Sequence, residues 1–193
     1  MVGNLFCVAV LLTAIASRVH YSQGECVGGG PRDTLYIAEF LNTSEPIWTF
    51  NSTATMSPVC KVDVIQQCTW TRVLLRRLYI ERHITHRNNL SGNIPNNQQD
   101  TMFITGQDNR CQREQLVYMA YTRSCAVVSV RLNCPYNTEY VELRVRNSSI
   151  LTGPDCGCLK KFDEYHSQGH RVYTADCQRI LEPGCRTSPC YGR

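Results

Sequence analysis

The sequence predicts an all-β fold, either a closed antiparallel barrel or a sandwich, with one helix before the strands and one after them. Three observations predict it. Apolar and polar residues alternate through several short segments, which is the pattern of strands with one buried face. Turn-forming residues separate these segments. Helical spacing of apolar residues occurs only near the two ends of this region.

Strands are expected over residues 47–56, 60–70, 73–84, 101–105, 114–121, 125–132 and 138–146. Residues 88–100 are rich in Asn and Gln and contain Gly92 and Pro95, so we expect a long exposed loop there. Segment 73–84 carries Arg76, Arg77 and Arg82 among its apolar residues. We expect these arginines to lie on a solvated strand face.

The first helix is expected to begin after Asp33, whose side chain can cap its amino end, and to carry Leu35, Ala38 and Leu41 on one side. The second helix is expected over residues 159–167, with an apolar edge that packs on the barrel wall. Gly169 then ends it. Residues 171–177 are expected to be extended.

The amino-terminal segment predicts secretion. Residues 5–16 form an apolar run of signal-peptide length that is too short to span a bilayer. Residues 1–24 are therefore expected to be a signal peptide, with cleavage after residue 16 or residue 24. Residues 25–193 are expected to form a single extracellular domain with a cysteine-containing carboxyl-terminal tail. No other run is long and apolar enough to span a membrane.

Cysteines and glycosylation motifs agree with an extracellular location. The chain has twelve cysteines, a density typical of a disulfide framework. Cys7 lies in the leader, so an odd number remains; either one thiol stays free or one pairs with another molecule. Glycosylation is expected at the four Asn-x-Ser/Thr motifs, which begin at Asn42, Asn51, Asn89 and Asn147.

No catalytic, cofactor-binding or metal-binding motif is recognisable. The sequence lacks a nucleophile elbow, a glycine-rich phosphate loop and paired cysteines at zinc-site spacing. The pairs His83–His86 and His166–His170 lack a further ligand at a familiar spacing. The net charge of +4 is too small and too dispersed to predict nucleic-acid binding. We therefore expect neither an enzyme nor a cofactor, metal or nucleic-acid partner.

The order of elements over residues 33–177 resembles the tick salivary lipocalins, a family that includes histamine-binding and japanin-like immunomodulatory members. The resemblance is carried by Cys125 with Val127 and Val128, by Glu142-Leu143, by the Cys156-x-Cys158 turn, and by Val172-Tyr173 before Cys177. It implies an eight-stranded antiparallel lipocalin barrel. It also implies disulfides Cys60–Cys177, Cys125–Cys158 and Cys26–Cys156.

Members of this family that bind amines share a Cys-Asp motif and a Glu-Leu-aromatic motif, in which carboxylates pair with the ammonium group. Here Ala126 replaces the aspartate and Arg144 replaces the aromatic residue, so Glu142 alone remains. Arg144 lies two residues from Glu142 on the same predicted strand and can therefore neutralise it. We expect histamine and serotonin to bind poorly.

If the family's facing holds, Ala126, Val128 and Val130 form a smooth apolar wall, and Tyr140, Glu142 and Arg144 supply polar groups. Such a cavity suits a hydrophobic molecule with one hydroxyl or carboxylate. The expected ligand-lining residues are Trp48, Phe50, Tyr79, Phe103, Tyr118, Ala126, Val128, Tyr140, Glu142 and Arg144.

The resemblance thus implies a secreted salivary lipocalin that binds a small hydrophobic ligand (sterol, fatty acid or eicosanoid-like) and modulates host immune or inflammatory responses. A host immune-cell or plasma protein is a further expected partner. Two alternatives remain open: a scavenger of biogenic amines, and an immunomodulator that binds a protein and uses the barrel as a scaffold.

Overall fold

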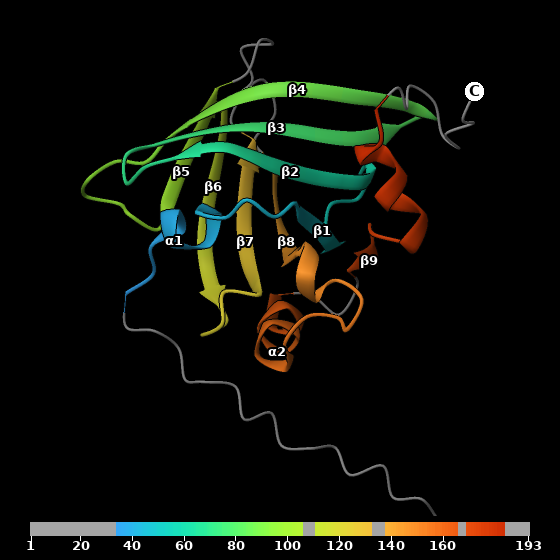
Figure 1. Cartoon of the computed structure of the whole chain (residues 1–193). Helices are drawn as coiled ribbons and strands as arrows, with labels where there is room; N and C mark the ends of the chain where they lie inside the picture. Colours follow the sequence, from blue (N-terminus) through green and yellow to red (C-terminus); the bar gives the residue numbers. More distant parts are fainter. Residues whose placement is uncertain (1–33, 106–110, 133–137, 166–168, 184–193) are drawn as a thin grey trace, which may run out of the picture.

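The computed structural model describes residues 34–105, 111–132, 138–165 and 169–183. Eight antiparallel strands form the barrel: β1 (Ile47–Ser52), β2 (Val59–Cys68), β3 (Arg72–Glu81), β4 (Ile84–Asn93), β5 (Thr101–Thr105), β6 (Cys111–Met119), β7 (Cys125–Leu132) and β8 (Thr138–Arg146) (Figure 1). Helix α1 (Ile37–Leu41) precedes them. The 3₁₀ turn η1 (Asn147–Ser149), helix α2 (Cys156–Tyr165), strand β9 (His170–Arg171) and the 3₁₀ helix η2 (Ala175–Leu181) follow.

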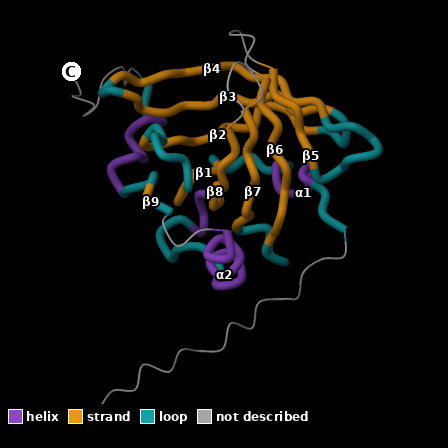
Figure 2. The backbone as a smooth tube through the Cα atoms, turned by 180° about the vertical axis from the view of Figure 1, so that it is seen from behind, coloured by secondary structure: helices purple, strands orange, loops and turns teal. Residues whose placement is uncertain are grey.

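The barrel is closed by β1. From β2 to β8 each strand pairs with the next one along the chain, and β1 pairs with both β8 and β2. Strand β9 adds to β1 outside the closed ring. In both views β2, β3 and β4 run crosswise to β5 to β8, and α2 lies beneath β7 and β8 (Figures 1 and 2). This up-and-down order, with a helix after the last strand, is the lipocalin architecture and confirms the predicted barrel.

The predicted exposed loop over residues 88–100 is wrong for its first half. Strand β4 runs to Asn93 and pairs with β3 along its whole length, from Glu81 opposite Ile84 to Arg72 opposite Asn93. The side chains of β4 are mostly polar, so the sequence shows no apolar alternation there. The strand is formed by backbone hydrogen bonds to β3, which composition does not predict. The turn between β3 and β4 also lacks typical turn residues. Arg82 and His83 both adopt positive φ, at 50° and 65°, where Asn or Gly is usual.

Three predictions outside the main strands need correction. Helix α1 begins at Ile37, so its start lies four residues beyond Asp33, which itself is outside the described residues. Residues 171–177 are not extended throughout, because β9 ends at Arg171 and η2 begins at Ala175. Helix α2 begins three residues earlier than predicted, at Cys156.

Two apolar layers lie on opposite sides of the barrel wall. The inner core joins α1 to the inward side chains of the strands, among them Val73, Leu75, Leu116, Ala126 and Val128. Because α1 packs against this set, it closes one end of the barrel. The outer layer packs Trp48, Leu143 and Val145 beneath Phe162 of α2 and Ile180 of η2.

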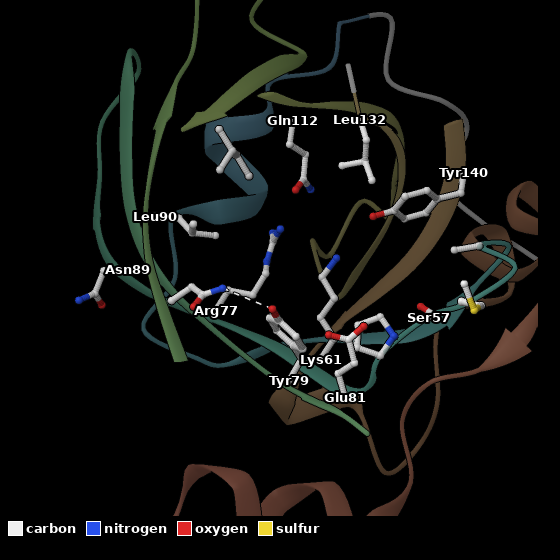
Figure 3. Close-up of a pocket in the computed structure, with 15 residues that line it drawn as sticks. Ser57, Lys61, Arg77, Tyr79, Glu81, Asn89, Leu90, Gln112, Leu132 and Tyr140 are labelled. Carbon is white, nitrogen blue, oxygen red and sulfur yellow. Dashed lines mark hydrogen bonds between the residues drawn. The ribbon is translucent and has the colours of Figure 1, made fainter. Parts of the chain in front are cut away.

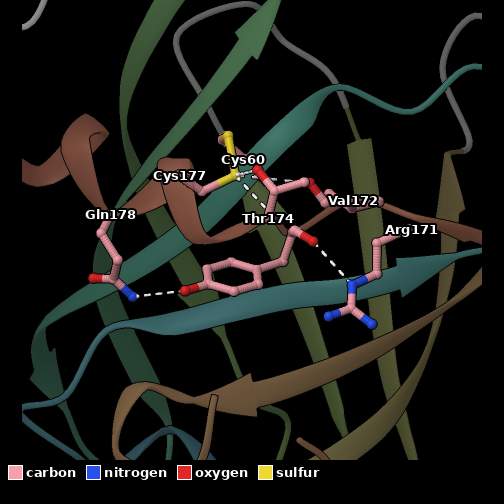
Figure 4. The surroundings of a disulfide bond; sticks show 7 residues. Cys60, Arg171, Val172, Thr174, Cys177 and Gln178 are labelled. Atoms are coloured by element: carbon pink, nitrogen blue, oxygen red, sulfur yellow. Dashed lines mark hydrogen bonds between the residues drawn. A yellow bond between two sulfur atoms is a disulfide. The ribbon is translucent and has the colours of Figure 1, made fainter. Parts of the chain in front are cut away.

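Two disulfides fasten the outer layer to the wall, and both are pairings that the family resemblance implied. Cys60–Cys177 joins β2 to η2, and Cys125–Cys158 joins β7 to α2. Around the first bond, Arg171 Nε donates to the Tyr173 carbonyl at 2.9 Å, and Gln178 Nε2 donates to the Tyr173 hydroxyl at 3.0 Å (Figure 4). The carboxyl-terminal segment is therefore held to the barrel covalently and by hydrogen bonds.

Candidate ligand-binding site

A cavity of about 280 Å³ opens at the end of the barrel opposite α1. Its wall is formed by the segment between β1 and β2 and by residues of every strand from β2 to β8. The lining residues are Ala54, Met56, Ser57, Pro58, Lys61, Arg77, Tyr79, Glu81, Asn88, Asn89, Leu90, Ile104, Gln112, Leu132 and Tyr140. The volume lies near the lower end of the usual range for ligand pockets, so it suits one compact ligand or one end of a longer ligand.

The floor of the cavity is polar. Lys61 and Arg77 point into the space between Gln112, Leu132 and Tyr140 (Figure 3). Both cationic side chains are almost fully buried, with whole-residue exposures of 5% each. Since burial of an unpaired charge is very costly, each of them requires a partner.

The partners form a buried group of six charged side chains, which we call the interior charge cluster. Its members are Lys61, Asp63, Arg77, Glu114, Glu142 and Arg144. They project inward from β2, β3, β6 and β8, and they lie between the cavity and the apolar inner core.

Glu142 is fully paired within this cluster. Lys61 Nζ lies 2.6 Å from its Oε1 atom, and Arg144 donates to its Oε2 atom from Nε at 2.9 Å and from Nη2 at 2.7 Å. The Thr49 hydroxyl lies 3.5 Å from Oε2. The predicted neutralisation of Glu142 by Arg144 is therefore confirmed, and Lys61 is a second cation that the sequence did not reveal.

The other two carboxylates are paired just as closely. Arg77 donates to both oxygens of Asp63, from Nε and Nη2, each at 2.7 Å. Its Nη2 atom also lies 2.9 Å from Glu114 Oε1, and Arg144 Nη1 lies 2.5 Å from Glu114 Oε2. Gln112 Nε2 donates to Glu114 Oε1 at 2.6 Å. Bidentate contacts of this kind are among the strongest hydrogen bonds in proteins.

The pairing lowers the pKa of two of these carboxyls, Glu142 and Glu114. Burial alone would raise the pKa of Glu142, but the charges of Lys61 and Arg144 lower it to about 2. Burial opposes ionisation of Glu114 in the same way, and Arg144 and Arg77 hold its pKa well below the ordinary value. Burial lowers the pKa of Lys61, and the nearby Glu142 offsets this only in part.

Two tyrosines provide hydroxyl groups at the cavity. Burial raises the pKa of Tyr140 above its ordinary value, so its phenol stays protonated and can donate a hydrogen bond. The Tyr79 hydroxyl accepts from Asn88 Nδ2 at 3.5 Å, and its ring stacks on His86 with centroids 4.8 Å apart.

The structure divides the ten predicted lining residues into three groups. Tyr79 and Tyr140 line the cavity. Ala126, Val128, Glu142 and Arg144 face the barrel interior deeper down, in the inner core or in the interior charge cluster. Trp48, Phe50, Tyr118 and Phe103 lie elsewhere: the first three belong to or pack against the outer layer, and Phe103 is 38% exposed.

The placement of Trp48 and Phe50 follows from the strand pairing. Thr49, which lies between them in the sequence, contacts Glu142 inside the barrel, so its neighbours face outward. Both aromatic rings contact Tyr173, with centroid distances of 5.0 Å and 6.5 Å. The expected ligand contact of these two residues is therefore replaced by packing in the outer layer.

Sequence reasoning missed Lys61, Asp63, Arg77 and Glu114. The expectation that Arg77 lies on a solvated face is wrong, since Arg77 is buried beside Asp63. A usable signal was present: Arg77 shares its strand parity with Val73 and Leu75, which are inner-core residues.

The four glycosylation motifs differ in exposure. Asn42 and Asn89 are exposed, and Asn89 points away from the barrel (Figure 3). Asn51 and Asn147 are half-buried. The Asn147 Oδ1 atom accepts hydrogen bonds from Trp48 Nε1 and Gln178 Nε2, each at 2.9 Å. Glycosylation of any of the four remains a prediction.

The last sequence predictions concern the remaining cysteines, metal binding and membrane spans. Cys26 lies outside the described residues, so the Cys26–Cys156 pairing remains a prediction. The Cys68 thiol is half-buried, and it donates to the Ala38 carbonyl at 3.6 Å. Within the described part of the chain, no three His, Cys, Asp or Glu side chains form a group able to hold a metal ion, and no helix is long and apolar enough to cross a membrane.

Comparison with known proteins adds one structural likeness. No protein-family model matches the sequence, and no curated protein matches it. Among solved structures, the fold is similar to apocrustacyanin C2, with a TM-score of 0.47 and 10% sequence identity, over 63% of this chain and 68% of that chain.

Proposed function

We propose that this protein binds one small hydrophobic ligand in the barrel cavity. The observation that carries the proposal is a closed eight-stranded barrel with a cavity of about 280 Å³ at its open end. A barrel of this size has an interior that is either filled by side chains or holds one small ligand, and here the end opposite α1 is unfilled. Sterols, fatty acids and eicosanoid-like molecules are the proposed ligand class.

The lining supports this class. Ala54, Pro58, Leu90, Ile104 and Leu132 give apolar contact, and Tyr79 and Tyr140 give two hydroxyl groups. Apolar walls with a few convergent polar groups are typical of sites that bind small hydrophobic molecules.

Amine scavenging has weaker support, because the carboxylate that would pair with the ammonium group is occupied. Glu142 already accepts from Lys61 and Arg144. A histamine or serotonin ammonium group would have to displace one of these cations. Isothermal titration with histamine checks this point: we expect no binding at micromolar concentrations, and micromolar or tighter binding would contradict our interpretation of Glu142.

The biological setting is part of the same proposal. The leader, the cysteine content and the resemblance to tick salivary lipocalins support a secreted binding protein that captures a host mediator and so modulates immune or inflammatory responses. We propose a binding role and not a catalytic one.

Ligand titration with a cavity-filling variant tests the proposal. Leu132→Trp places an indole in the cavity, whereas Phe103→Trp adds similar bulk to a residue that is 38% exposed and does not line the cavity. We expect wild type and Phe103→Trp to bind a sterol, a fatty acid or an eicosanoid, and Leu132→Trp to lose that binding while keeping its fold. Equal binding by all three proteins would place the ligand outside the cavity.

The same two variants separate ligand binding from a scaffold role. An immunomodulator that uses the barrel only as a scaffold would keep its effect on immune cells when Leu132→Trp blocks the cavity. Removal of Arg144 is unsuitable for this purpose, because its guanidinium is buried among three carboxylates and its loss would perturb the fold.

A further inference from the structure

We propose that the cavity selects uncharged ligands over both acids and amines, because the interior charge cluster beneath it is already electrically balanced. This inference rests on the proposed function and deepens it, since sterols and fatty alcohols are uncharged whereas fatty acids and many eicosanoids are anionic at neutral pH.

The balance follows from the buried residues themselves. Lys61, Arg77 and Arg144 contribute three positive charges, and Asp63, Glu114 and Glu142 contribute three negative charges, so their formal sum is zero. Each of these charges forms an ion pair with another member of the cluster. Each carboxylate lies within 2.9 Å of at least one cationic nitrogen.

A charged ligand group would disturb this balance. A carboxylate at the floor would compete with Glu142 for Lys61 and leave one negative charge without a partner. An ammonium group would compete with Lys61 for Glu142 and leave one positive charge without a partner. In a site shielded from water, an uncompensated charge costs more than the new contact returns.

An uncharged oxygen avoids this cost. The lysine ammonium group has three donors, and the bond to Glu142 uses one of them, so a ligand hydroxyl or carbonyl can accept from Lys61 without breaking the ion pair. The Tyr140 side chain points toward the same space (Figure 3). Glu81 also lines the cavity, but it is exposed to solvent, where its charge is screened.

The rival interpretation is an anion site. Lys61 and Arg77 line the cavity, whereas Asp63, Glu114 and Glu142 do not. If the two cationic groups that face the cavity outweighed the carboxylates behind them, acids would bind best. The experiment below separates these interpretations by changing the charge of the cluster in each direction.

Decanol, decanoate and decylamine share one alkyl chain and differ in the charge of the head group. Their dissociation constants are measured at about pH 8 for wild type, Glu142→Gln and Lys61→Met. Glu139→Gln and Lys161→Met serve as matched controls, because they make the same changes in net charge at exposed ion pairs, Arg131–Glu139 and Lys161–Glu164. Thermal melts confirm that each variant is folded.

Wild type is expected to bind decanol about tenfold or more tightly than decanoate or decylamine. Glu142→Gln gives the cluster one excess positive charge and should shift the preference toward decanoate by about tenfold. Lys61→Met gives it one excess negative charge and should shift the preference toward decylamine. The two surface controls should keep the wild-type order.

The outcomes separate the inference from the proposed function. Wild-type binding of decanoate as tight as that of decanol overturns the charge selectivity while the proposed function stands. Unchanged preferences in both interior variants overturn it as well. If wild type binds none of the three probes, the proposed function fails, and this inference fails with it. If one interior variant does not fold, the other still decides the question.

Discussion

Removal of the Arg144 guanidinium should destabilise the protein strongly. This side chain is 2% exposed, and its nitrogens contact Glu142 at 2.7 Å, Glu114 at 2.5 Å and Asp63 at 3.7 Å. Arg144→Met keeps much of the apolar stem but leaves three buried carboxylates with two cations. Breaking a buried ion pair in this way costs about 3–5 kcal/mol, which is a large part of the roughly 5–15 kcal/mol that stabilises a typical domain.

Urea unfolding at neutral pH, with disulfides intact, measures this cost. The matched control is Arg131→Met, which removes an arginine from a pair whose side chains are 42% and 51% exposed. Exposed pairs contribute about 0–1 kcal/mol, so the control should lose little stability.

A second change provides the decisive comparison. Adding Glu114→Gln to Arg144→Met restores the charge balance, with two cations and two carboxylates, and should recover part of the lost stability. The double-mutant cycle should therefore show a coupling of about 1 kcal/mol or more. A loss for Arg144→Met no larger than that of Arg131→Met, or additive effects in the cycle, would refute the balanced interior cluster.

Three further predictions follow from other parts of the structure. The Glu142 pKa falls from 4.5 to about 2 on folding, so its contribution, on the order of 3 kcal/mol, is present above about pH 4.5 and is lost as the pH falls toward 2; urea midpoints against pH should show this, and Glu142→Gln should flatten the dependence. The Cys60–Cys177 bond closes a longer loop than Cys125–Cys158, with sequence separations of 117 and 33, so paired Cys→Ser changes should cost about 5 and about 4 kcal/mol respectively in unfolding experiments. Gly92→Ala should cost about 1–3 kcal/mol in thermal melts, because a Cβ there would lie 2.3 Å from Met102 Sδ; a neutral effect would show that Met102 moves aside freely.

The alternating pattern is local, and it predicted an antiparallel barrel or a sandwich; the family resemblance then implied the eight-stranded barrel. Alternation in β8 places Val141, Leu143 and Val145 in the outer layer and Glu142 and Arg144 inside the barrel. The family resemblance identified the two disulfides that hold α2 and η2. Strand β4 escaped prediction because a polar strand has no hydrophobic period, and its pairing with β3 is made by the backbone. Its hairpin residues, Arg82 and His83, are not typical turn formers.

The interior charge cluster could be predicted only in part. The Glu142–Arg144 contact is local, since residues two apart on a strand share a face. The contacts that complete the cluster join residues far apart in the chain, such as Lys61 with Glu142 and Arg77 with Glu114. A single sequence does not reveal which charged residues of different strands meet inside a barrel. Nor did it reveal that Trp48 and Phe50 face outward, because both faces of β1 are buried.

Native mass spectrometry of protein secreted from eukaryotic cells tests the central claim most directly. We expect a co-purified adduct that dissociates as an uncharged hydrophobic molecule, present on wild type and on Phe103→Trp but absent from Leu132→Trp. An adduct identified as an acid or an amine, or one that the Leu132→Trp variant retains, would contradict a barrel cavity that holds an uncharged hydrophobic ligand above a balanced charge cluster.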